Sequence, residues 1–383
     1  MVRQIRILIT TGIFPPEVGG PATILERLGS DLVGAGFYVT VLTYGAPEKK
    51  ARPFKLVSVS RNWFSPLRHL FFAARTFFLA RQADIIYTTD LYSPGFYSMI
   101  AAKFCHKKFV VRFAGDSAWE TALNRGLSND DILTFQEKTY GSFIEKLKRR
   151  RTKILKSADA VVAVSDFIKN LAVKIGVRKE KIHVIYNAVD FLGKLPERQK
   201  PDFPILVTAC RLTPWKGVEM LIRVMARLKD KYPDIKFEIL GEGSQEESLK
   251  SLVKSSKLEK NVNFRGRVSQ SEILSIFAHS TIFVLNTNYE GLSHTILEAM
   301  SVGIPVITTP VGGNPELIKD NENGLLVKYN DEAVWQTAIE RLLNEESLQE
   351  KFIANSRKVL EKFKWDELLQ KTANVFNELN SPV

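Results

Sequence analysis

Two glutamates, Glu290 and Glu298, stand eight positions apart in the stretch NYEGLSHTILEAM (288–300). The sequence predicts a helix that begins between them, and Ser293 is a residue type that caps such a helix, leaving its first backbone N–H groups available to an anion. Carboxylates repel phosphate but accept hydrogen bonds from hydroxyl groups. The pattern therefore favours a ligand that combines phosphate with sugar hydroxyls.

A second turn could hold phosphate oxygens. The stretch ACRLTPWKG (209–217) directly follows an apolar segment and carries Arg211 and Lys216 across a proline-containing turn. Two cations at the carboxyl end of a strand, near the start of a helix, suit a diphosphate. Taken singly, these cations could be solvated surface charges, and the two glutamates could be exposed helix-end residues.

Two glycine pairs also precede predicted helices. Gly19 and Gly20 lie in TTGIFPPEVGGPAT (10–23), and the second pair lies in TTPVGGNPELI (308–318). Paired glycines allow the backbone to approach a ligand closely, although a purely structural turn is as common. The G-x-G-x-x-G spacing is missing, which argues against a dinucleotide-dependent dehydrogenase.

Short apolar segments alternate with amphipathic stretches along the whole chain, which is typical of buried parallel strands joined by helices. The predicted strands are 5–10, 38–43, 84–89, 108–113 and 159–165 in the first half, and 204–210, 236–241, 261–266, 281–286, 304–309 and 324–328 in the second. A polar stretch with two prolines, 191–203, separates the two sets and is typical of a linker. We expect two doubly wound α/β domains with a cleft between them, and ligands at the carboxyl ends of the strands.

Composition is that of a globular, core-forming protein, with 383 residues, 45% of them hydrophobic and 25% charged. Cys105 and Cys210 lie far apart, so neither a disulfide framework nor a zinc site is expected, and a reducing cytoplasm is the expected location. The start of the sequence has no signal-peptide pattern, and no apolar run is long enough for a membrane-spanning helix.

Positive charge is concentrated in the first half. Met1–Asp190 holds 29 Lys and Arg against 16 Asp and Glu, whereas Phe191–Val383 holds 25 against 26. The asymmetry indicates a polyanionic partner: an anionic membrane surface, an anionic substrate or nucleic acid. The Phe-rich stretch 65–81 could be an interfacial helix, and 145–156 adds a basic run. At helical spacing, however, such phenylalanines more often belong to the core.

Seven motifs together resemble the retaining glycosyltransferases of family 4. They are FPPEVGG (14–20), DAVVAVSDFIK (159–169), VIYNAVD (184–190), RLTPWKG (211–217), ILGEG (239–243), NVNFRG (261–266) and EGLSHTILEAMSVGIPVITTPVGGNPELI (290–318). The resemblance covers nearly the whole chain and implies the GT-B fold, two Rossmann-like domains facing a central cleft. It further implies an acceptor-binding domain at 1–190, a donor-binding domain at 191–362, and a final helix at 363–383 that packs back toward the first domain.

The resemblance also implies roles for individual residues. Arg211 and Lys216 would bind the diphosphate of the donor, Glu290 would contact the donor sugar, and Glu298 would contact the ribose. The remaining donor-binding positions would be Gly19, Gly20, Gly291, Leu292 and Ser293. The family's reaction is described as front-face displacement with retention. No D-x-D pair occurs in the sequence, so we expect cations to replace a divalent metal, with no metal and no other cofactor.

One departure affects the acceptor side. Many relatives have a histidine after the fourth N-terminal strand, whereas VVRFAGDSAWE (110–120) has none. Asp116 is the best substitute there as the group that accepts the proton of the attacking hydroxyl. It could instead pair with Arg112 or cap the following helix.

The predicted function is transfer of a sugar from a nucleotide-diphosphate sugar to a glycan or lipid-linked acceptor for the cell envelope. The expected location is the cytoplasm or the inner face of the membrane. The alternatives are a nucleotide-sugar epimerase or a disaccharide synthase on the same fold and, more distantly, a nucleic-acid-binding protein, for which no aromatic and basic RNA-binding motif is present. We expect no nucleic-acid partner.

Overall fold

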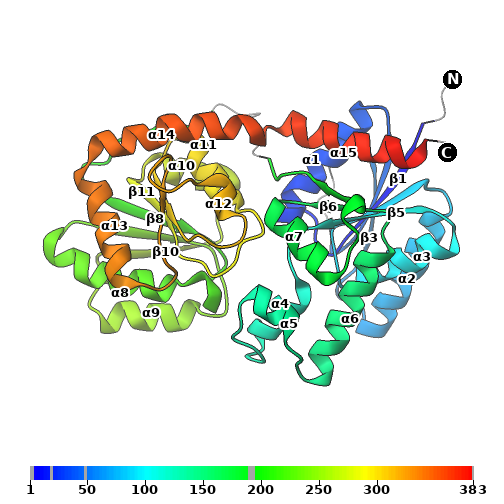
Figure 1. Ribbon diagram of the computed structural model, residues 1–383, viewed down its shortest axis with the longest axis horizontal. Helices are drawn as coiled ribbons and strands as arrows, with labels where there is room; N and C mark the ends of the chain where they lie inside the picture. Colours follow the sequence, from blue (N-terminus) through cyan, green and yellow to red (C-terminus); the bar gives the residue numbers. More distant parts are fainter. Residues whose placement is uncertain (1–3, 18–19, 47–49, 189–194, 382–383) are drawn as a thin grey trace. The chain divides into compact units, whose positions relative to one another are not determined.

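A computed structural model describes residues 4–17, 20–46, 50–188 and 195–381 (Figure 1). The chain forms two compact units. Unit 1 comprises Met1–Tyr186 together with Asp366–Val383, and unit 2 comprises Asn187–Trp365. The chain thus leaves the first unit close to the predicted boundary at residue 190, and its last helix lies within unit 1.

Unit 1 is built on a seven-stranded sheet in the order β3-β2-β1-β4-β5-β6-β7, with every described pairing parallel. The strands are β1 (Arg6–Thr11), β2 (Tyr38–Tyr44), β3 (Lys55–Val59), β4 (Ile85–Thr88), β5 (Lys108–Phe113), β6 (Ala160–Ala163) and β7 (Ile182–Val184). Its central strands are continuous apolar runs because helices cover both faces of the sheet. The edge strands β3 and β7 were not predicted, since each is short and only partly buried.

The helices of unit 1 are α1 (Gly20–Gly34), α2 (Ser65–Ala80), α3 (Ser93–Phe104), α4 (Ser117–Asn124), α5 (Ile132–Glu137), α6 (Ser142–Ser157), α7 (Asp166–Ile175) and α15 (Trp365–Asn380), with a 3₁₀ turn η1 (Lys179–Lys181). Helix α2 packs along α3, and α3 also contacts α6. The ring of Phe376 in α15 is fully buried and lies 6.1 Å from the ring of Phe37 and 5.6 Å from that of Tyr87. The last helix therefore completes the core of the first unit.

Unit 2 repeats the design with a six-stranded sheet in the order β10-β9-β8-β11-β12-β13. Its strands are β8 (Ile205–Ala209), β9 (Lys236–Leu240), β10 (Val262–Gly266), β11 (Ile282–Leu285), β12 (Val306–Thr308) and β13 (Leu325–Leu326). Its helices are α8 (Val218–Lys231), α9 (Glu246–Ser255), α10 (Gln270–Ala278), α11 (His294–Ser301), α12 (Asn314–Leu317), α13 (Glu332–Asn344) and α14 (Glu346–Leu360), with 3₁₀ turns η2 (Pro214–Lys216) and η3 (Glu361–Phe363). Fully buried Phe237, Trp335 and Phe352 belong to its core.

Both sheets reverse their strand order at one place, between β1 and β4 in unit 1 and between β8 and β11 in unit 2. At such a switch point the loops that follow the two strands run to opposite faces of the sheet, and ligands bind between them at the carboxyl edge. The prediction of two doubly wound Rossmann-like domains is confirmed. Within the described ranges no helix is long and apolar enough to cross a membrane, and both cysteines are free thiols.

Candidate active site

An ion pair joins the two loops at the switch point of unit 2. The ammonium group of Lys216, in the turn after β8, contacts the carboxylate of Glu290, in the loop after β11. The two side chains are only 10% and 17% exposed, so each charge depends on the other for compensation. Lys216 therefore neutralises the carboxylate of Glu290 at this edge.

Asn286 fixes the turn that carries Lys216. Its amide nitrogen Nδ2 donates to the carbonyl of Gly217 at 2.9 Å and to Oδ1 of Asn330 at 2.7 Å. Gly217 has a φ of 51°, in the left-handed region, and a Cβ atom there would come within 2.2 Å of Nδ2 of Asn286. Only glycine therefore allows this close approach. The backbone N–H of Asn288 also donates to the carbonyl of Trp215 at 2.8 Å, so the loops are locked together.

Arg211 lies directly after β8 and its side chain is exposed. The backbone on either side of it is held by the loop after β9, since the N–H of Leu212 donates to the carbonyl of Glu242 at 2.9 Å. Cβ atoms at Gly241 and Gly243 would lie 2.0 Å from the carbonyl of Cys210 and 2.3 Å from that of Leu212. The backbone that carries Arg211 is therefore fixed at the same edge as Lys216.

Burial raises the pKa of the Cys210 thiol to about 11. The thiol is therefore protonated at neutral pH and is not a candidate nucleophile.

The helix that follows the Glu290 loop begins as the sequence predicts. Ser293 caps α11, its hydroxyl accepting from the N–H of Ile296 at 3.3 Å. Gly291 and Leu292 are buried directly before it, and the carbonyl of Leu292 accepts from the side chain of Asn187 at 3.2 Å. The N-terminus of α11 is thus held at the edge that carries Lys216 and Arg211.

The second glycine pair, Gly312 and Gly313, packs against the loop that carries Glu290. A Cβ atom at Gly312 would lie 1.9 Å from the carbonyl oxygen of Glu290, and one at Gly313 would lie 2.3 Å from that of Gly291. The N–H of Gly313 donates to the carbonyl of Glu290 at 3.0 Å. These glycines therefore serve close packing against the Glu290 loop, rather than the direct ligand cradle that the sequence suggested.

Glu298 lies in the second turn of α11 and is 9% exposed. Its Oε1 accepts from Nε2 of Gln270 at 3.0 Å, and burial raises its pKa to about 7. Gln270 opens α10, whose start is fixed by a capping box of Ser269 and Glu272. Sequence analysis missed Gln270 and Asn286, because neither stands in a spacing that distinguishes it from an ordinary polar residue.

On unit 1, the structure gives Asp116 a structural role. It is fully buried and caps α4, accepting from the N–H groups of Ala118 at 3.0 Å and Trp119 at 3.4 Å. Its other oxygen accepts from Gln136 at 3.0 Å and forms an ion pair with Arg151. The capping interpretation is confirmed, but the ionic partner is Arg151 and not Arg112. With both oxygens engaged, we no longer assign Asp116 as the proton acceptor.

Two predicted donor-binding positions remain. Gly20 is the first residue of α1, and Gly19 lies outside the described residues. Among those residues, no group of three or more His, Cys, Asp and Glu side chains could hold a metal ion.

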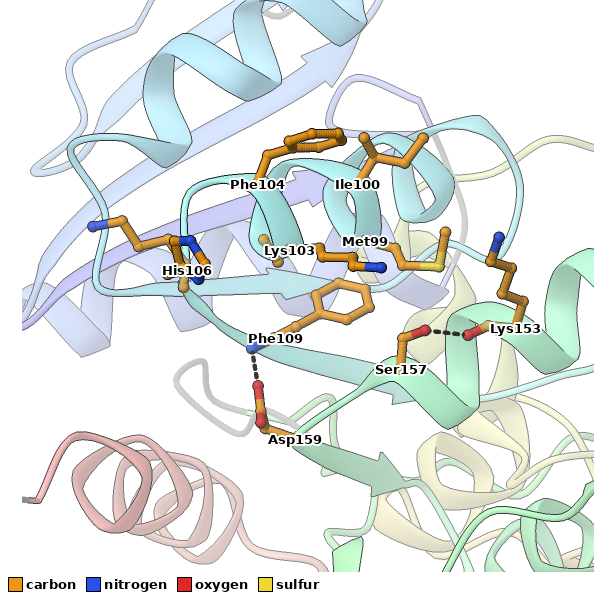
Figure 2. Close-up of a pocket in the computed structure, with 11 residues that line it drawn as sticks. Met99, Ile100, Lys103, Phe104, His106, Phe109, Lys153, Ser157 and Asp159 are labelled. Atoms are coloured by element: carbon orange, nitrogen blue, oxygen red, sulfur yellow. Dashed lines mark hydrogen bonds between the residues drawn. The ribbon is translucent and has the colours of Figure 1, made fainter. Parts of the chain in front are cut away.

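A cavity of about 500 Å³ lies elsewhere in unit 1 (Figure 2). It is lined by residues at the end of α3, the start of β5 and the end of α6, among them Met99, Lys103, Phe104, Lys107 and Lys153. Asp159 accepts from the N–H of Phe109 at 2.8 Å at this place (Figure 2). Because β5 starts there, the cavity is at the amino edge of the sheet and is not part of a switch-point site.

Taken together, the β8/β11 edge offers the exposed residue Arg211, a paired ammonium, a capped helix N-terminus, the half-buried carboxylate of Glu290 and the buried carboxylate of Glu298. Two family models match the chain: "Glycosyl transferases group 1" over residues 194–359 and "Glycosyltransferase Family 4" over residues 18–191. The chain belongs to the group 1 glycosyltransferases. The resemblance to glycosyltransferases inferred from the motifs is thereby confirmed.

Individual relatives agree with this assignment. An uncharacterized glycosyltransferase of Methanocaldococcus jannaschii is 27% identical, with 97% of each chain covered. The crystal structure of Anabaena HepE in complex with UDP and glucose matches with a TM-score of 0.80 and 19% identity, covering 98% of this glycosyltransferase and all of HepE. Sucrose-phosphate synthase from Thermosynechococcus elongatus matches with a TM-score of 0.81 and 19% identity, with 98% and 99% covered. Both solved structures share the GT-B fold with this chain.

Proposed function

We propose that this glycosyltransferase takes its sugar from a nucleotide-diphosphate sugar bound at the β8/β11 edge of unit 2. The observation that carries the proposal is the ion pair between Lys216 and Glu290 at the switch point, with Arg211 at the same edge. A diphosphate needs cations, whereas a sugar needs hydrogen-bond acceptors for its hydroxyls. The two loops supply both at one place. HepE, which shares the fold, was crystallised with UDP, and this supports a donor of the same class.

In this proposal Arg211, Lys216 and the N-terminus of α11 bind the diphosphate, and Glu290 binds the transferred sugar. Negative charge grows on the diphosphate as the glycosidic bond breaks, so positioned cations stabilise the transition state more than the ground state. Glu298 accepts from the ribose hydroxyls. The reaction proceeds with retention of the anomeric configuration and needs no divalent metal.

A thermal-shift panel of UDP-, GDP- and ADP-sugars tests the donor class. One nucleotide series should raise the melting temperature of the wild type but not that of Arg211→Ala, while Lys254→Ala, which removes an exposed cation on α9, should respond like the wild type. No shift with any nucleotide sugar would contradict the proposal. NMR of the enzyme with the active donor alone tests for an epimerase, because an epimerase forms its product without an acceptor. The NMR coupling constant of the anomeric proton in a transfer product tests retention.

We also propose that the acceptor is lipid-linked and is reached at an anionic bilayer through unit 1. Three of the four phenylalanines of α2 are exposed rather than in the core: Phe71 by 45%, Phe77 by 41% and Phe78 by 67%. Only Phe72 is buried. The expectation that these phenylalanines belong to the core is therefore wrong for most of them.

Neighbouring elements extend this surface, which we define as the exposed side chains of α2, the end of α3 and α6. Phe64 before α2 and Phe104 at the end of α3 are each 72% exposed. Exposed cations accompany them: Arg75 on α2, and Lys146, Arg149, Lys153 and Lys156 on α6. Apolar and basic side chains together favour the interface of an anionic membrane, where each cation contributes about 1 kcal/mol. The cavity of Figure 2, with its three lysines, lies among these elements and could hold a lipid phosphate.

Vesicle flotation tests the membrane surface. The wild type should float with vesicles that contain phosphatidylglycerol and remain behind with pure phosphatidylcholine vesicles. The variant Phe71→Ser/Phe78→Ser should lose binding, whereas Phe203→Ser, an exposed phenylalanine of unit 2, should retain it. Equal recovery with both vesicle types at low salt would contradict the proposal.

A further inference from the structure

The β1/β4 edge of unit 1 is the counterpart of the β8/β11 edge of unit 2, and a carboxylate stands at it. Asp90 lies in the short loop after β4, and Gly12 follows β1. A Cβ atom at residue 12 would lie 2.5 Å from Oδ2 of Asp90, and it would meet no other residue within 4 Å. The absence of a side chain at Gly12 therefore leaves room for the Asp90 carboxylate at the switch point.

The two oxygens of Asp90 have different surroundings. Oδ1 accepts from the backbone N–H of Tyr92 at 2.6 Å, and the N–H of Gly95 also donates to the carboxylate. No side chain in the described part of the chain forms a hydrogen bond or ion pair with it. Asp90 thus differs from Asp116, whose two oxygens are used by the fold. Oδ2, beside Gly12, is placed to meet a hydroxyl group from outside the protein.

Charged and titratable groups from several elements surround this carboxylate. Arg61, in the loop after β3, donates from Nη2 to the carbonyl of Gly12 at 2.5 Å and pairs with Glu17. Arg150 of α6 lies over the ring of Phe96 at 4.4 Å. The negative charge of Asp90 also acts on Tyr44 and Tyr92, and Tyr97, Arg68 and His69 in turn interact with Tyr44.

The surroundings of Asp90 set the pKa of its carboxyl group, which decides whether it can accept a proton. Burial raises the pKa of Asp90 to about 6, although the backbone N–H donors, Arg150 and Arg61 oppose the rise. Burial and the cations Arg68 and Arg150 lower the pKa of His69. At neutral pH, Asp90 is ionised and more basic than an ordinary aspartate, as a general base should be.

We infer that the acceptor hydroxyl binds at Asp90 and gives its proton to this carboxylate during transfer. The inference rests on the proposed function. The O–H bond of the acceptor breaks and its proton moves to Oδ2, while the acceptor oxygen forms the new bond to the anomeric carbon. The bond between that carbon and the diphosphate breaks, and its electron pair leaves with the diphosphate. The competing recipient of the proton is the leaving diphosphate itself.

Asp90→Asn separates these routes, because an amide oxygen still accepts from the N–H groups of Tyr92 and Gly95 but cannot take up a proton. Water serves as the acceptor probe, so the measurement is hydrolysis of the active nucleotide sugar at saturating donor, from pH 5 to 8. The wild-type kcat should rise as the pH passes through about 6. The variant should be slower by about 10²-fold or more and lack this rise, with unchanged donor affinity and melting temperature.

Two further variants serve as a control and as a second test. Asp84→Asn changes an aspartate that accepts from the backbone N–H of Arg6 at 2.9 Å, at the opposite edge of the same sheet, and it should match the wild type. Gly12→Ala keeps the carboxylate but displaces it, and we expect it to lower kcat. This variant provides the test should Asp90→Asn fail to fold. Wild-type kcat and pH dependence in Asp90→Asn, or in Gly12→Ala, would overturn the inference and leave the diphosphate as the proton acceptor. A wild-type protein that hydrolyses no nucleotide sugar would instead overturn the proposed function.

Discussion

The β8/β11 edge of unit 2 pairs its buried charges with one another, whereas the β1/β4 edge of unit 1 leaves a carboxylate next to cations without direct pairing. At the first edge Lys216 contacts Glu290, and Asn286 locks the two loops together. At the second, the Asp90 carboxylate accepts only from backbone N–H groups among the residues that the structure describes, and the guanidinium of Arg150 lies over an aromatic ring. A preformed charge pair suits a ligand that carries fixed charges. A weakly restrained carboxylate suits a group that must change its protonation state.

The two units have the same strand order around the switch point, so topology does not cause this difference. It comes from the residues placed in the loops after four strands. The fold supplies two equivalent edges, and loop chemistry gives them separate tasks.

The largest effect should follow Lys216→Ala, which breaks the charge pair of unit 2. The variant would lose the contact to the diphosphate that we propose, and it leaves the half-buried Glu290 carboxylate without its ionic partner. We expect kcat/KM for the donor to fall by about 10²-fold or more and the melting temperature to drop. The double variant Lys216→Ala/Glu290→Gln should regain stability but not activity. Recovery of both would mean that the pair is only structural.

Asp116→Ala tests the claim that unit 1 uses its two edge aspartates differently. Loss of the α4 cap and of the partner of buried Arg151 should lower the free energy of unfolding by about 3 kcal/mol or more. Denaturant titration measures this, and nucleotide-sugar binding should persist in the folded fraction. If Asp116→Ala is as stable as the wild type but inactive, the assignments of Asp116 and Asp90 would have to be exchanged.

A smaller effect concerns Glu298. Ribose hydroxyls donate to the ionised carboxylate, but the pKa of about 7 leaves much of it protonated below neutral pH. Affinity for the nucleotide sugar should therefore rise about 10-fold from pH 6 to pH 8, and Glu298→Gln should remove that dependence. The same shift, upward from 4.5, makes its contribution to folding stability fall as the pH rises from 4.5 to about 7, and it changes little above that pH. Calorimetric titration measures the affinity. If the affinity of Glu298→Gln still rises with pH, the assignment of Glu298 to the ribose is wrong.

The smallest expected effect is that of EDTA. If Arg211, Lys216 and the N-terminus of α11 neutralise the diphosphate, transfer should continue at its original rate in the chelator. Loss of activity that magnesium or manganese restores would show that the cations of unit 2 do not suffice.

Strand positions could be predicted from the sequence because buried parallel strands are continuous apolar runs, and β5 was located at its observed bounds, Lys108–Phe113. Arg211, Lys216 and Glu290 were placed at one edge because carboxyl ends of parallel strands share an edge. The exposure of Phe71 and Phe78 was not predictable, since periodicity identifies an apolar face but not what covers it.

The roles of Asp90 and Asp116 could not be predicted from the local sequence pattern. Asp90 and Asp116 each follow a buried strand, and nothing nearby distinguishes them. The different roles of Asp90 and Asp116 depend on two tertiary features. Strand β4, and not β5, is the neighbour of β1, and Arg151, 35 positions away in the sequence, binds Asp116. The link between Gln270 and Glu298 is likewise a tertiary contact without a sequence signal.

The position of α15 has a consequence for biosynthesis. Phe376 fills the core of unit 1 beside Phe37 and Tyr87, yet a ribosome adds it only after the whole of unit 2. Residues 187–365 can fold while the chain is still being extended, but the unit that began first must wait for the last helix. A nascent chain stalled before residue 366 should therefore expose the apolar surface around Phe37, where a chaperone that recognises such surfaces can bind.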